Sequence, residues 1–313
     1  MIMTKKLLLT GASGFIGQHL LKELARGDYE VHAVLLKGTS VKDTWALHVH
    51  HANINEHAKI SAVVKKTSPD YVIHLAGASS VAKSFNNYES TMNSNYHSAV
   101  NLAEACRKEG SIRQFIFAGS SEEYGAALKD AKQRITEDTL LKPASPYAIS
   151  KAYADMYLQY LGSAYDFPFT VVRPFNTYGR KDSNSFFMEK TISHMLTNER
   201  NINLGDPSLV RDWLYVDDHV SGYMKVIGNK AAMGQVIQLC TGKGHSIIET
   251  TELIASMTNF KGKISWNAVP KRPSEASIVI GDNSKAKKLL GWEPKYDLKQ
   301  GLEKTIEFWR SKL

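Results

Sequence analysis

Tyr147 and Lys151 are the side chains whose spacing points most directly to chemistry. They open and close the run YAISK, and in a helix this four-residue spacing places two side chains on one face. A neighbouring cation stabilises a phenolate, so we expect Lys151 to lower the pKa of Tyr147 towards neutrality and to make it a general base. The spacing also occurs by chance, so its meaning depends on the residues around it.

A polar run after the apolar segment Gln114–Ala118 supplies further candidates. It reads GSSEEYG over positions 119–125 and contains Ser120 and Glu122. Catalytic groups gather at the carboxyl ends of the strands in an open α/β sheet, where this run lies if Gln114–Ala118 is a strand. We therefore expect Ser120 and Glu122 to lie near Tyr147 and Lys151.

A glycine-rich run, TGASGFIG over positions 10–17, follows the first apolar segment. Gly11 permits a tight turn, Gly14 lets the backbone approach a pyrophosphate, and Gly17 lets a helix pack closely on a sheet. The helix amino terminus adds free N–H groups and the positive end of the helix dipole. We predict a dinucleotide site here, against the alternative of a plain strand-to-helix turn. Its predicted members are Gly11, Ser13, Gly14, Phe15, Ile16 and Gly17.

The end of the second apolar run bears on which dinucleotide binds. An acidic residue there would bind the ribose 2′-hydroxyl of NAD, but the sequence reads VLLK at 34–37, with no acid. Lys37 is placed to meet a 2′-phosphate, which favours NADP over NAD. The alternative is that Lys37 is simply solvated.

An alternation of strands and helices must hold these motifs. Apolar runs predict buried strands at Leu7–Thr10, Val31–Leu36, Tyr71–Leu75, Gln114–Ala118 and Phe169–Val172. Helical periodicity lies between them at Phe15–Arg26, His57–Thr67, Tyr88–Lys108 and Tyr147–Tyr165. The alternation predicts an α/β fold, a Rossmann-type doubly wound parallel sheet, over residues 1–173.

The regular alternation of strands and helices ends after about Pro174. Helical patterns at Phe186–Leu196, Asp217–Ile227, Ile247–Met257 and Leu298–Trp309 are joined by Gly-, Pro- and Asp-rich links. We expect residues 174–313 to form a smaller mixed α/β substrate lobe packed on the first domain.

Composition narrows the class of protein. The 313 residues are 43% hydrophobic and 22% charged, as in ordinary globular proteins. The net charge of +8 raises the alternative of nucleic-acid binding, but no basic helix with interleaved aromatics and no zinc-finger spacing supports it. No run approaches the ~20 apolar residues of a membrane span. Two cysteines make neither a disulfide framework nor a metal site, so we expect a cytoplasmic protein without a bound metal.

Together the motifs resemble the extended short-chain dehydrogenases/reductases, the NAD(P)-dependent epimerases, dehydratases and reductases of nucleotide sugars. The resemblance rests on the glycine run, HLAG at 74–77, Asn95, Ser120, Tyr147, Lys151, RPFN at 173–176 and RDWLYVDD at 211–218. It implies that Tyr147 takes the proton of a sugar 4-hydroxyl, that Ser120 shares this hydrogen bond, and that Lys151 binds the nicotinamide ribose. The resemblance adds Asn53, Ile54, Leu75, Ala76, Gly77, Asn95, Tyr147 and Lys151 to the cofactor site, and Ser121, Asn176 and Arg211 to the substrate site.

Two acidic residues and an arginine indicate which branch of that family the chain resembles most. Glu122 lies where 4,6-dehydratases carry the base for the carbon-5 proton, although it is also placed to cap its loop. Arg272 can match phosphate oxygens and Glu275 can accept from ribose hydroxyls, in an arrangement similar to the GDP-sugar branch. We therefore expect a GDP-mannose-type 4,6-dehydratase. The alternatives are a GDP-4-keto-6-deoxy-sugar reductase or a GDP-sugar 4-dehydrogenase, and below them a 4-epimerase or a UDP-sugar decarboxylase.

The resemblance also implies a homodimer, formed through a four-helix bundle of Tyr88–Lys108 and Tyr147–Tyr165. The chain departs from GDP-mannose dehydratases in NTYGRK at 176–181, which favours a dimer over a tetramer. Four histidines at 48, 50, 51 and 57 lack helical metal-ligand spacing, and we expect a loop around a short strand. The final Ser-Lys-Leu matches a peroxisomal signal, with coincidence as the favoured interpretation.

Overall fold

The apolar runs of the first half form a parallel sheet at the predicted positions. The computed structural model describes all residues except 1–3, 42–46, 129, 131, 182 and 198. Within the described chain the large sheet has the order β10-β6-β5-β4-β1-β2-β3, and every neighbouring pair is parallel. Its strands are β1 (Lys5–Thr10), β2 (Tyr29–Leu35), β3 (Leu47–His51), β4 (Tyr71–His74), β5 (Gln114–Ala118), β6 (Phe169–Pro174) and β10 (Gln235–Leu239). The direction of strand order reverses between β1 and β4, which is where doubly wound sheets bind their ligands.

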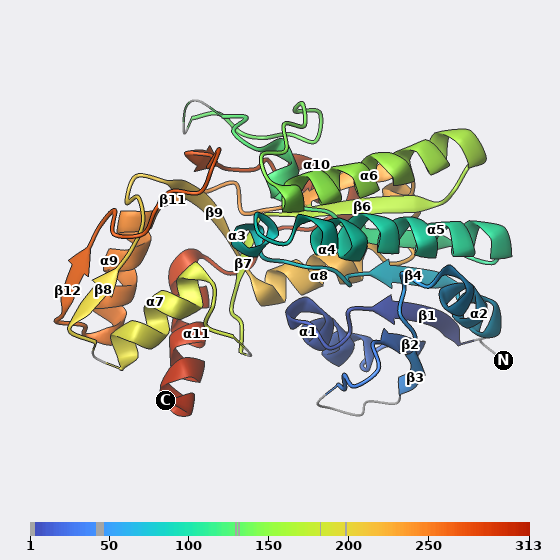
Figure 1. Ribbon diagram of the computed structural model, residues 1–313, viewed down its shortest axis with the longest axis horizontal. Coiled ribbons are helices and arrows are strands. Elements are labelled where there is room, and N and C mark those ends of the chain that lie inside the picture. The colour runs from blue at the N-terminus through green and yellow to red at the C-terminus, as the bar shows by residue number, and fades with distance from the viewer. Residues whose placement is uncertain (1–3, 42–46, 129, 131, 182, 198) are drawn as a thin grey trace.

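Helices cover both faces of the sheet, as predicted (Figure 1). Because side chains alternate along a strand, Leu7 and Leu9 of β1 enter one core and Leu8 enters the other. The first core includes α1 (Phe15–Leu24) and α8 (Val216–Val226). The second includes α2 (His57–Thr67), α5 (Ser98–Glu109) and α6 (Pro146–Tyr165). The segment predicted as one helix over 88–108 comprises α4 (Tyr88–Met92), a π-helical turn η1 (Asn93–His97) and α5.

The second half builds a smaller lobe beside the sheet. A small sheet joins β7 (Asn176–Tyr178), β9 (Val210–Tyr215), β11 (Gly244–Ser246) and β13 (Ile278–Val279), and a separate pair joins β8 (Asn201–Asn203) to β12 (Lys263–Ser265). The helices of the lobe are α7 (Phe187–Leu196), α9 (Ile247–Thr258) and α11 (Leu298–Lys312), at the left of Figure 1. The strands of the large sheet run towards this lobe, so their carboxyl ends face it.

One strand that follows the proposed boundary at residue 173/174 belongs to the large sheet of the first part. β10 lies within the second half of the chain and yet pairs with β6 in the large sheet. Four short helices remain in the described chain: α3 (Val81–Ser84) follows β4, α10 (Ser284–Leu290) precedes α11, and the 3₁₀ helices η2 (Ser121–Tyr124) and η3 (Lys230–Ala232) follow β5 and α8.

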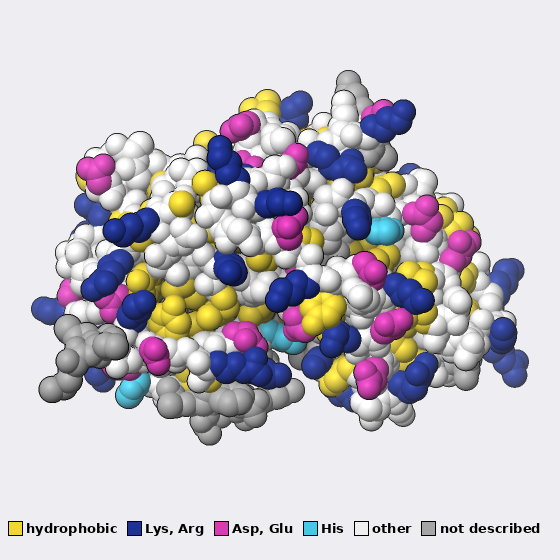
Figure 2. All heavy atoms as spheres, turned by 180° about the vertical axis from the view of Figure 1, so that it is seen from behind, with side chains coloured by type: hydrophobic (Ala, Val, Ile, Leu, Met, Phe, Trp, Pro, Cys, Tyr) yellow, Lys and Arg dark blue, Asp and Glu magenta, His cyan; other side chains and the backbone are white. Residues whose placement is uncertain are grey.

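The positive charge is spread over the face of the molecule shown in Figure 2. On the face shown in Figure 2, Lys and Arg side chains lie among Asp and Glu side chains instead of forming one continuous basic patch. None of the helices in the described residues has the length and apolar character to cross a membrane.

Candidate active site

The glycine turn between β1 and α1 has no room for side chains. A Cβ on Gly11, whose φ is +73°, would lie 2.6 Å from the backbone nitrogen of Ala76. A Cβ on Gly17 would lie 2.1 Å from the carbonyl oxygen of Gly11. Gly14 is the N-cap of α1 and has no side chain with which to cap the helix, and the described first turn carries no acidic residue. Uncapped N–H groups at a helix amino terminus suit a phosphate, so this turn fits a dinucleotide.

The other predicted members of this turn lie around the same helix start. Phe15 is buried and contacts His19 edge to face, with ring centroids 5.5 Å apart. Ile16 is half-buried. Ser13 is also half-buried, and its carbonyl oxygen accepts a hydrogen bond from the Gln18 side chain at 2.7 Å.

A buried histidine fixes the segment after β4 next to the glycine turn. His74 Nδ1 lies 2.7 Å from the Thr10 hydroxyl, and its Nε2 lies 3.3 Å from the Ser98 hydroxyl. Ser98 donates its own proton to the Ser94 carbonyl oxygen, so it accepts from Nε2–H, and Nδ1 accepts from Thr10. Thr10 in turn accepts from the Ala76 N–H at 3.3 Å. Burial lowers the pKa of His74 to about 3, which keeps the ring neutral.

Asn95 is placed behind the cofactor segment, in the π-helical turn. It is fully buried, and its Nδ2 donates to the Ala78 carbonyl oxygen at 3.2 Å and to the Ser150 hydroxyl at 2.9 Å. A Cβ on Gly77, whose φ is +155°, would lie 2.4 Å from Asn95 Oδ1. Asn95 therefore joins the loop after β4 to helix α6. The neighbouring residues Leu75 and Ala76 are half-buried.

Three further residues predicted for the cofactor site follow β2 and β3. Lys37 is exposed two residues after β2, so its ammonium is accessible to an anion. Asn53 is exposed two residues after β3, and its Oδ1 accepts from the Asn55 N–H. Ile54 is buried, and its carbonyl oxygen accepts from the Asn101 side chain.

Ser120, Tyr147 and Lys151 come together at the carboxyl end of β5. The Ser120 side chain lies beside the Tyr147 phenol and acts on its pKa as a hydrogen-bond donor would. Lys151 is 5% exposed, and its Nζ donates to the Ala118 carbonyl oxygen at 2.8 Å. Burial lowers the pKa of Lys151 to about 8. The catalytic set predicted from the sequence is thus assembled from a loop and one helix.

The predicted direction of the Tyr147 pKa is wrong. Burial raises it to about 12, and the carboxylates of Glu122 and Glu123 also act to raise it. The hydrogen bond from Ser120 acts to lower it but does not prevail. The sequence argument took account of the neighbouring ammonium and not of the cost of burying a phenolate.

A pocket next to this set brings together most of the predicted substrate residues. Its lining includes Glu122, Arg211, Arg272 and Glu275. Arg211 is 5% exposed and donates to the carbonyl oxygen of Val210 at 2.9 Å. Side chains of both charges around a pocket suit a ligand with a phosphate and hydroxyl groups.

Glu275 is engaged differently from the prediction. Its Oε1 accepts from Arg272 Nε at 3.1 Å and lies 3.5 Å from Arg211 Nη2. It therefore orients the two arginines, whereas the sequence suggested a carboxylate available to ribose hydroxyls. Ser121 is buried within the loop. Asn176 has a buried Oδ1 with no hydrogen-bond partner in the described part of the chain, which leaves an acceptor for a ligand.

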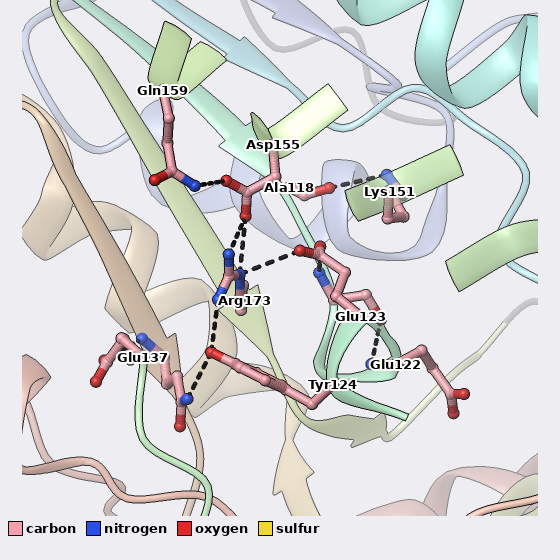
Figure 3. Close-up of polar contacts among 11 residues, drawn as sticks. Ala118, Glu122, Glu123, Tyr124, Glu137, Lys151, Asp155, Gln159 and Arg173 are labelled. Atoms are coloured by element: carbon pink, nitrogen blue, oxygen red, sulfur yellow. Dashed lines mark hydrogen bonds and ion pairs between the residues drawn. The ribbon is translucent and has the colours of Figure 1, made fainter. Parts of the chain in front are cut away.

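Sequence reasoning missed Glu123, Asp155 and Arg173, a buried ionic cluster beneath the catalytic loop (Figure 3). One signal was available for Asp155, because it lies four positions after Lys151 on the apolar helix and thus on the same face. The pairing with Glu123 is long-range and has no local signal. The described residues contain no group of three or more His, Cys, Asp or Glu side chains placed to hold a metal ion.

Comparisons with known proteins agree with this geometry. The sequence model of the family described as GDP-mannose 4,6 dehydratase matches residues 8–305. The GDP-6-deoxy-D-mannose reductase of Pseudomonas aeruginosa is 28% identical over 99% of both chains. A UDP-glucose 4-epimerase from Thermotoga maritima, solved with UDP-glucose, is 30% identical over 98% of this chain and 99% of its own, with a TM-score of 0.90. MoeE5, solved with UDP-glucuronic acid and NAD, is 27% identical over 98% of this chain and 100% of its own, with a TM-score of 0.88.

The family match covers the glycine turn, the Ser120–Tyr147–Lys151 set and the arginine-lined pocket. The chain therefore belongs to the extended short-chain dehydrogenases/reductases, the family of NAD(P)-dependent nucleotide-sugar epimerases, dehydratases and reductases.

Proposed function

We propose that the protein is a nucleotide-sugar 4,6-dehydratase that acts on a GDP-hexose of the GDP-mannose type. The observation that carries this proposal is the position of Glu122. It lines the same pocket as Arg211 and Arg272 and comes two residues after Ser120, which contacts Tyr147. A second acid–base group next to the Tyr147 phenol is what an elimination requires and a simple hydride transfer does not.

The nicotinamide cofactor fits the glycine turn, the segment after β4 and Lys151. When bound, NAD(P) would supply the acceptor, and later the donor, of hydride. An oxidised nicotinamide is cationic, and a positive charge near the phenol would lower the pKa of Tyr147 from about 12. The protein supplies Lys151 as a second cation held by the Ala118 carbonyl oxygen.

Two side chains would handle the protons of the proposed reaction. Tyr147 Oη, next to Ser120, takes the proton of the sugar 4-hydroxyl as carbon 4 is oxidised to a ketone. Glu122 takes the proton of carbon 5, which the new ketone has made acidic, and passes it to the carbon-6 hydroxyl, which leaves as water. The proton taken up by Tyr147 balances the one that carbon 5 receives as carbon 6 receives the hydride from bound NAD(P), so the product is a 4-keto-6-deoxy sugar with no net oxidation.

A second candidate keeps the same residues and ends at hydride transfer. The similarity to a GDP-6-deoxy-D-mannose reductase extends over 99% of both chains and favours this alternative, as a GDP-4-keto-6-deoxy-sugar reductase or a 4-dehydrogenase. The resemblance to a UDP-glucose 4-epimerase structure keeps UDP as the alternative to GDP and epimerisation as a third reaction.

Product mass and cofactor stoichiometry decide between these candidates. GDP-, UDP-, dTDP- and CDP-hexoses are incubated separately with the enzyme, and products are weighed by mass spectrometry. A dehydratase gives a loss of about 18 Da without added reduced cofactor, as elimination of one water requires. A reductase consumes one NADPH per turnover. Glu122→Gln should abolish dehydration and spare reduction, and Tyr147→Phe should slow either by about 10²–10⁴-fold. Near-normal turnover by Tyr147→Phe would refute the mechanism.

We propose NADP as the preferred cofactor, with NAD as the alternative. Lys37 is exposed just after β2, where a 2′-phosphate would lie, and β2 ends without an acid. NAD is kept as the alternative because MoeE5, which is similar over its whole length, was solved with NAD. Fluorescence titration of the wild type should give tighter binding of NADP, and Lys37→Asp should reverse the preference. A wild-type preference for NAD would contradict the proposal.

We also propose a cytoplasmic homodimer in two structural parts, residues 1–173 and 174–313, with β10 returning from the second to the first. The two cysteines are buried free thiols, which suits a reducing compartment. The dimer rests on an exposed apolar row along α6, formed by Tyr153, Met156 and Tyr160, which are 49–58% exposed. A second copy of this chain, packing α6 and the neighbouring α4 and α5 in a four-helix bundle, would cover it.

A further inference from the structure

Two adjacent acids in the catalytic loop point in opposite directions. Glu122 lies towards the pocket, while Glu123 turns into the protein interior towards Arg173 (Figure 3). Glu123 is fully buried, and its Oε1 accepts a hydrogen bond from the backbone N–H of Ser120 at 2.7 Å. The Glu123 carboxyl group is therefore in direct contact with the residue that holds the Tyr147 phenol.

The other side of Glu123 faces helix α6 through Arg173. Glu123 Oε2 lies 3.1 Å from Arg173 Nε. Arg173 Nε donates to Asp155 Oδ2 at 2.8 Å, and Arg173 Nη2 lies 2.8 Å from the same oxygen. Asp155 belongs to α6, one helical turn after Lys151. Arg173 belongs to β6, and its Nη1 donates to the Tyr124 hydroxyl at 2.8 Å. The bridge thus joins the Ser120 loop, strand β6 and the helix that carries Tyr147 and Lys151.

We propose that Glu123 is a positioning residue for the catalytic set, because it holds the Ser120 loop in register with helix α6 through Arg173 and Asp155. This inference rests on the proposed function. Ser120 and the pair Tyr147 and Lys151 come from segments that are distant in sequence, so their relative placement must be set by contacts between the loop and the helix. Lys151 with the Ala118 carbonyl oxygen is one such contact, and the Glu123 bridge is another.

The two carboxyl oxygens of Glu123 have different partners. Oε1 accepts from the Ser120 N–H, and Oε2 lies 3.1 Å from Arg173 Nε. A glutamine at position 123 could keep the acceptor for the Ser120 N–H, but its amide N–H group would then face the Arg173 guanidinium, which is itself a donor. It would therefore keep the hydrogen bond to the loop and lose the ion pair with Arg173.

Three substitutions of Glu123 distinguish its positioning role from the effects of its charge and its volume. Glu123→Leu removes the hydrogen bond to Ser120 and the ion pair with Arg173 at similar volume. Glu123→Asp keeps the charge but withdraws the carboxyl group by one methylene, away from the Ser120 N–H. Glu123→Gln removes the ion pair with Arg173 and keeps an acceptor for the Ser120 N–H. Glu252→Leu, at an exposed position on α9, is the matched control.

We expect Glu123→Leu and Glu123→Asp to lower kcat by about 10–100-fold, the scale of a misplacement of about 1 Å. KM for the nucleotide sugar and Kd for the dinucleotide should change by less than about threefold, since neither ligand contacts Glu123. Glu123→Gln keeps the Ser120 hydrogen bond and loses the ion pair, so it should lose less kcat than Glu123→Leu, and Glu252→Leu should keep kcat within about threefold. Wild-type kcat in Glu123→Asp, or equal losses in Glu123→Gln and Glu123→Leu, would overturn the inference. If Glu123→Leu fails to fold, the Asp and Gln variants still decide.

A second readout needs no substrate. Hydrogen exchange of the Ser120 amide should accelerate at least tenfold in Glu123→Leu and Glu123→Asp and stay at the wild-type rate in Glu123→Gln, because only the first two release that N–H. If the wild type turned over no nucleotide sugar while the exchange rates behaved as expected, the proposed function would be refuted and the bridge would stand. Normal exchange in Glu123→Leu and Glu123→Asp would refute the bridge instead.

Discussion

At the scale of single residues, burial outweighs neighbouring charge in this active site. Tyr147 and Lys151 lie on one helix face, as their spacing requires, yet burial moves both pKa values towards the neutral forms, to about 12 and about 8. Their catalytic states therefore depend on charges that arrive with ligands. Residue types and spacing identify the participants, but the protonation states come from the tertiary surroundings.

Two buried histidines make stability dependent on pH. Burial lowers the pKa values of His74 and His219 to about 3, against about 6.5 in an unfolded chain. The unfolded state therefore binds more protons between these values, so stability is complete above pH 6.5 and is lost as the pH falls. Each of the two histidines should lower the unfolding free energy by about 2 kcal/mol at pH 5 relative to pH 8. Urea unfolding between pH 4 and 8 measures this slope.

A single substitution checks the assignment of that slope. In His219→Leu, unfolding between pH 3 and 6.5 should take up about one proton fewer than in the wild type. The slope of the unfolding free energy against pH should therefore be smaller, whatever the substitution does to stability at pH 8. An unfolding free energy independent of pH below 6.5 in the wild type would contradict the buried, neutral state of both rings.

At the scale of elements, continuous apolar runs predicted the parallel strands because these strands are buried on both faces, and helical periodicity predicted the flanking helices. β10 was missed because its five residues include two glutamines, and one of them, Gln238, is buried through hydrogen bonds to Tyr124 and Asp282. Periodicity cannot detect a polar side chain whose partner is more than a hundred residues away. The Glu123–Arg173–Asp155 bridge was missed because its members come from a loop, a strand and a helix and repeat with no helical or strand period.

The glycine turn gives a prediction about one element. Gly17→Ala places a methyl group 2.1 Å from the Gly11 carbonyl oxygen, so helix α1 must shift away from the turn. We expect a loss of about 1–3 kcal/mol in unfolding free energy, as for overpacked sites, and weaker dinucleotide binding. Thermal unfolding and fluorescence titration measure the two effects.

Gly205→Ala is the control for that substitution. A Cβ on Gly205 meets nothing within 4 Å, so the variant should match the wild type in both measurements. Equal behaviour of the two variants would show that the turn tolerates a shift of α1.

At the scale of the whole molecule, the exposed row on α6 predicts self-association. Met156→Glu combined with Tyr160→Glu should convert a dimer of the 34.9 kDa chain into a monomer, because two charges would be buried in the interface. Sedimentation velocity measures the change. Leu140→Glu, at a site that is 72% exposed and outside α6, should leave the dimer intact. A monomeric wild type would contradict the four-helix interface.

The return of β10 to the large sheet has a consequence for how the molecule unfolds. The chain passes from sheet to lobe after β6, comes back for α8 and β10, and leaves again for β11. Without β10, strand β6 would be an open apolar edge and a site for aggregation. The two parts are thus interleaved rather than joined by a single connection, and we expect them to melt together. Calorimetry of the full chain should show one cooperative transition, and two separated transitions would mean that the lobe is an independent folding unit.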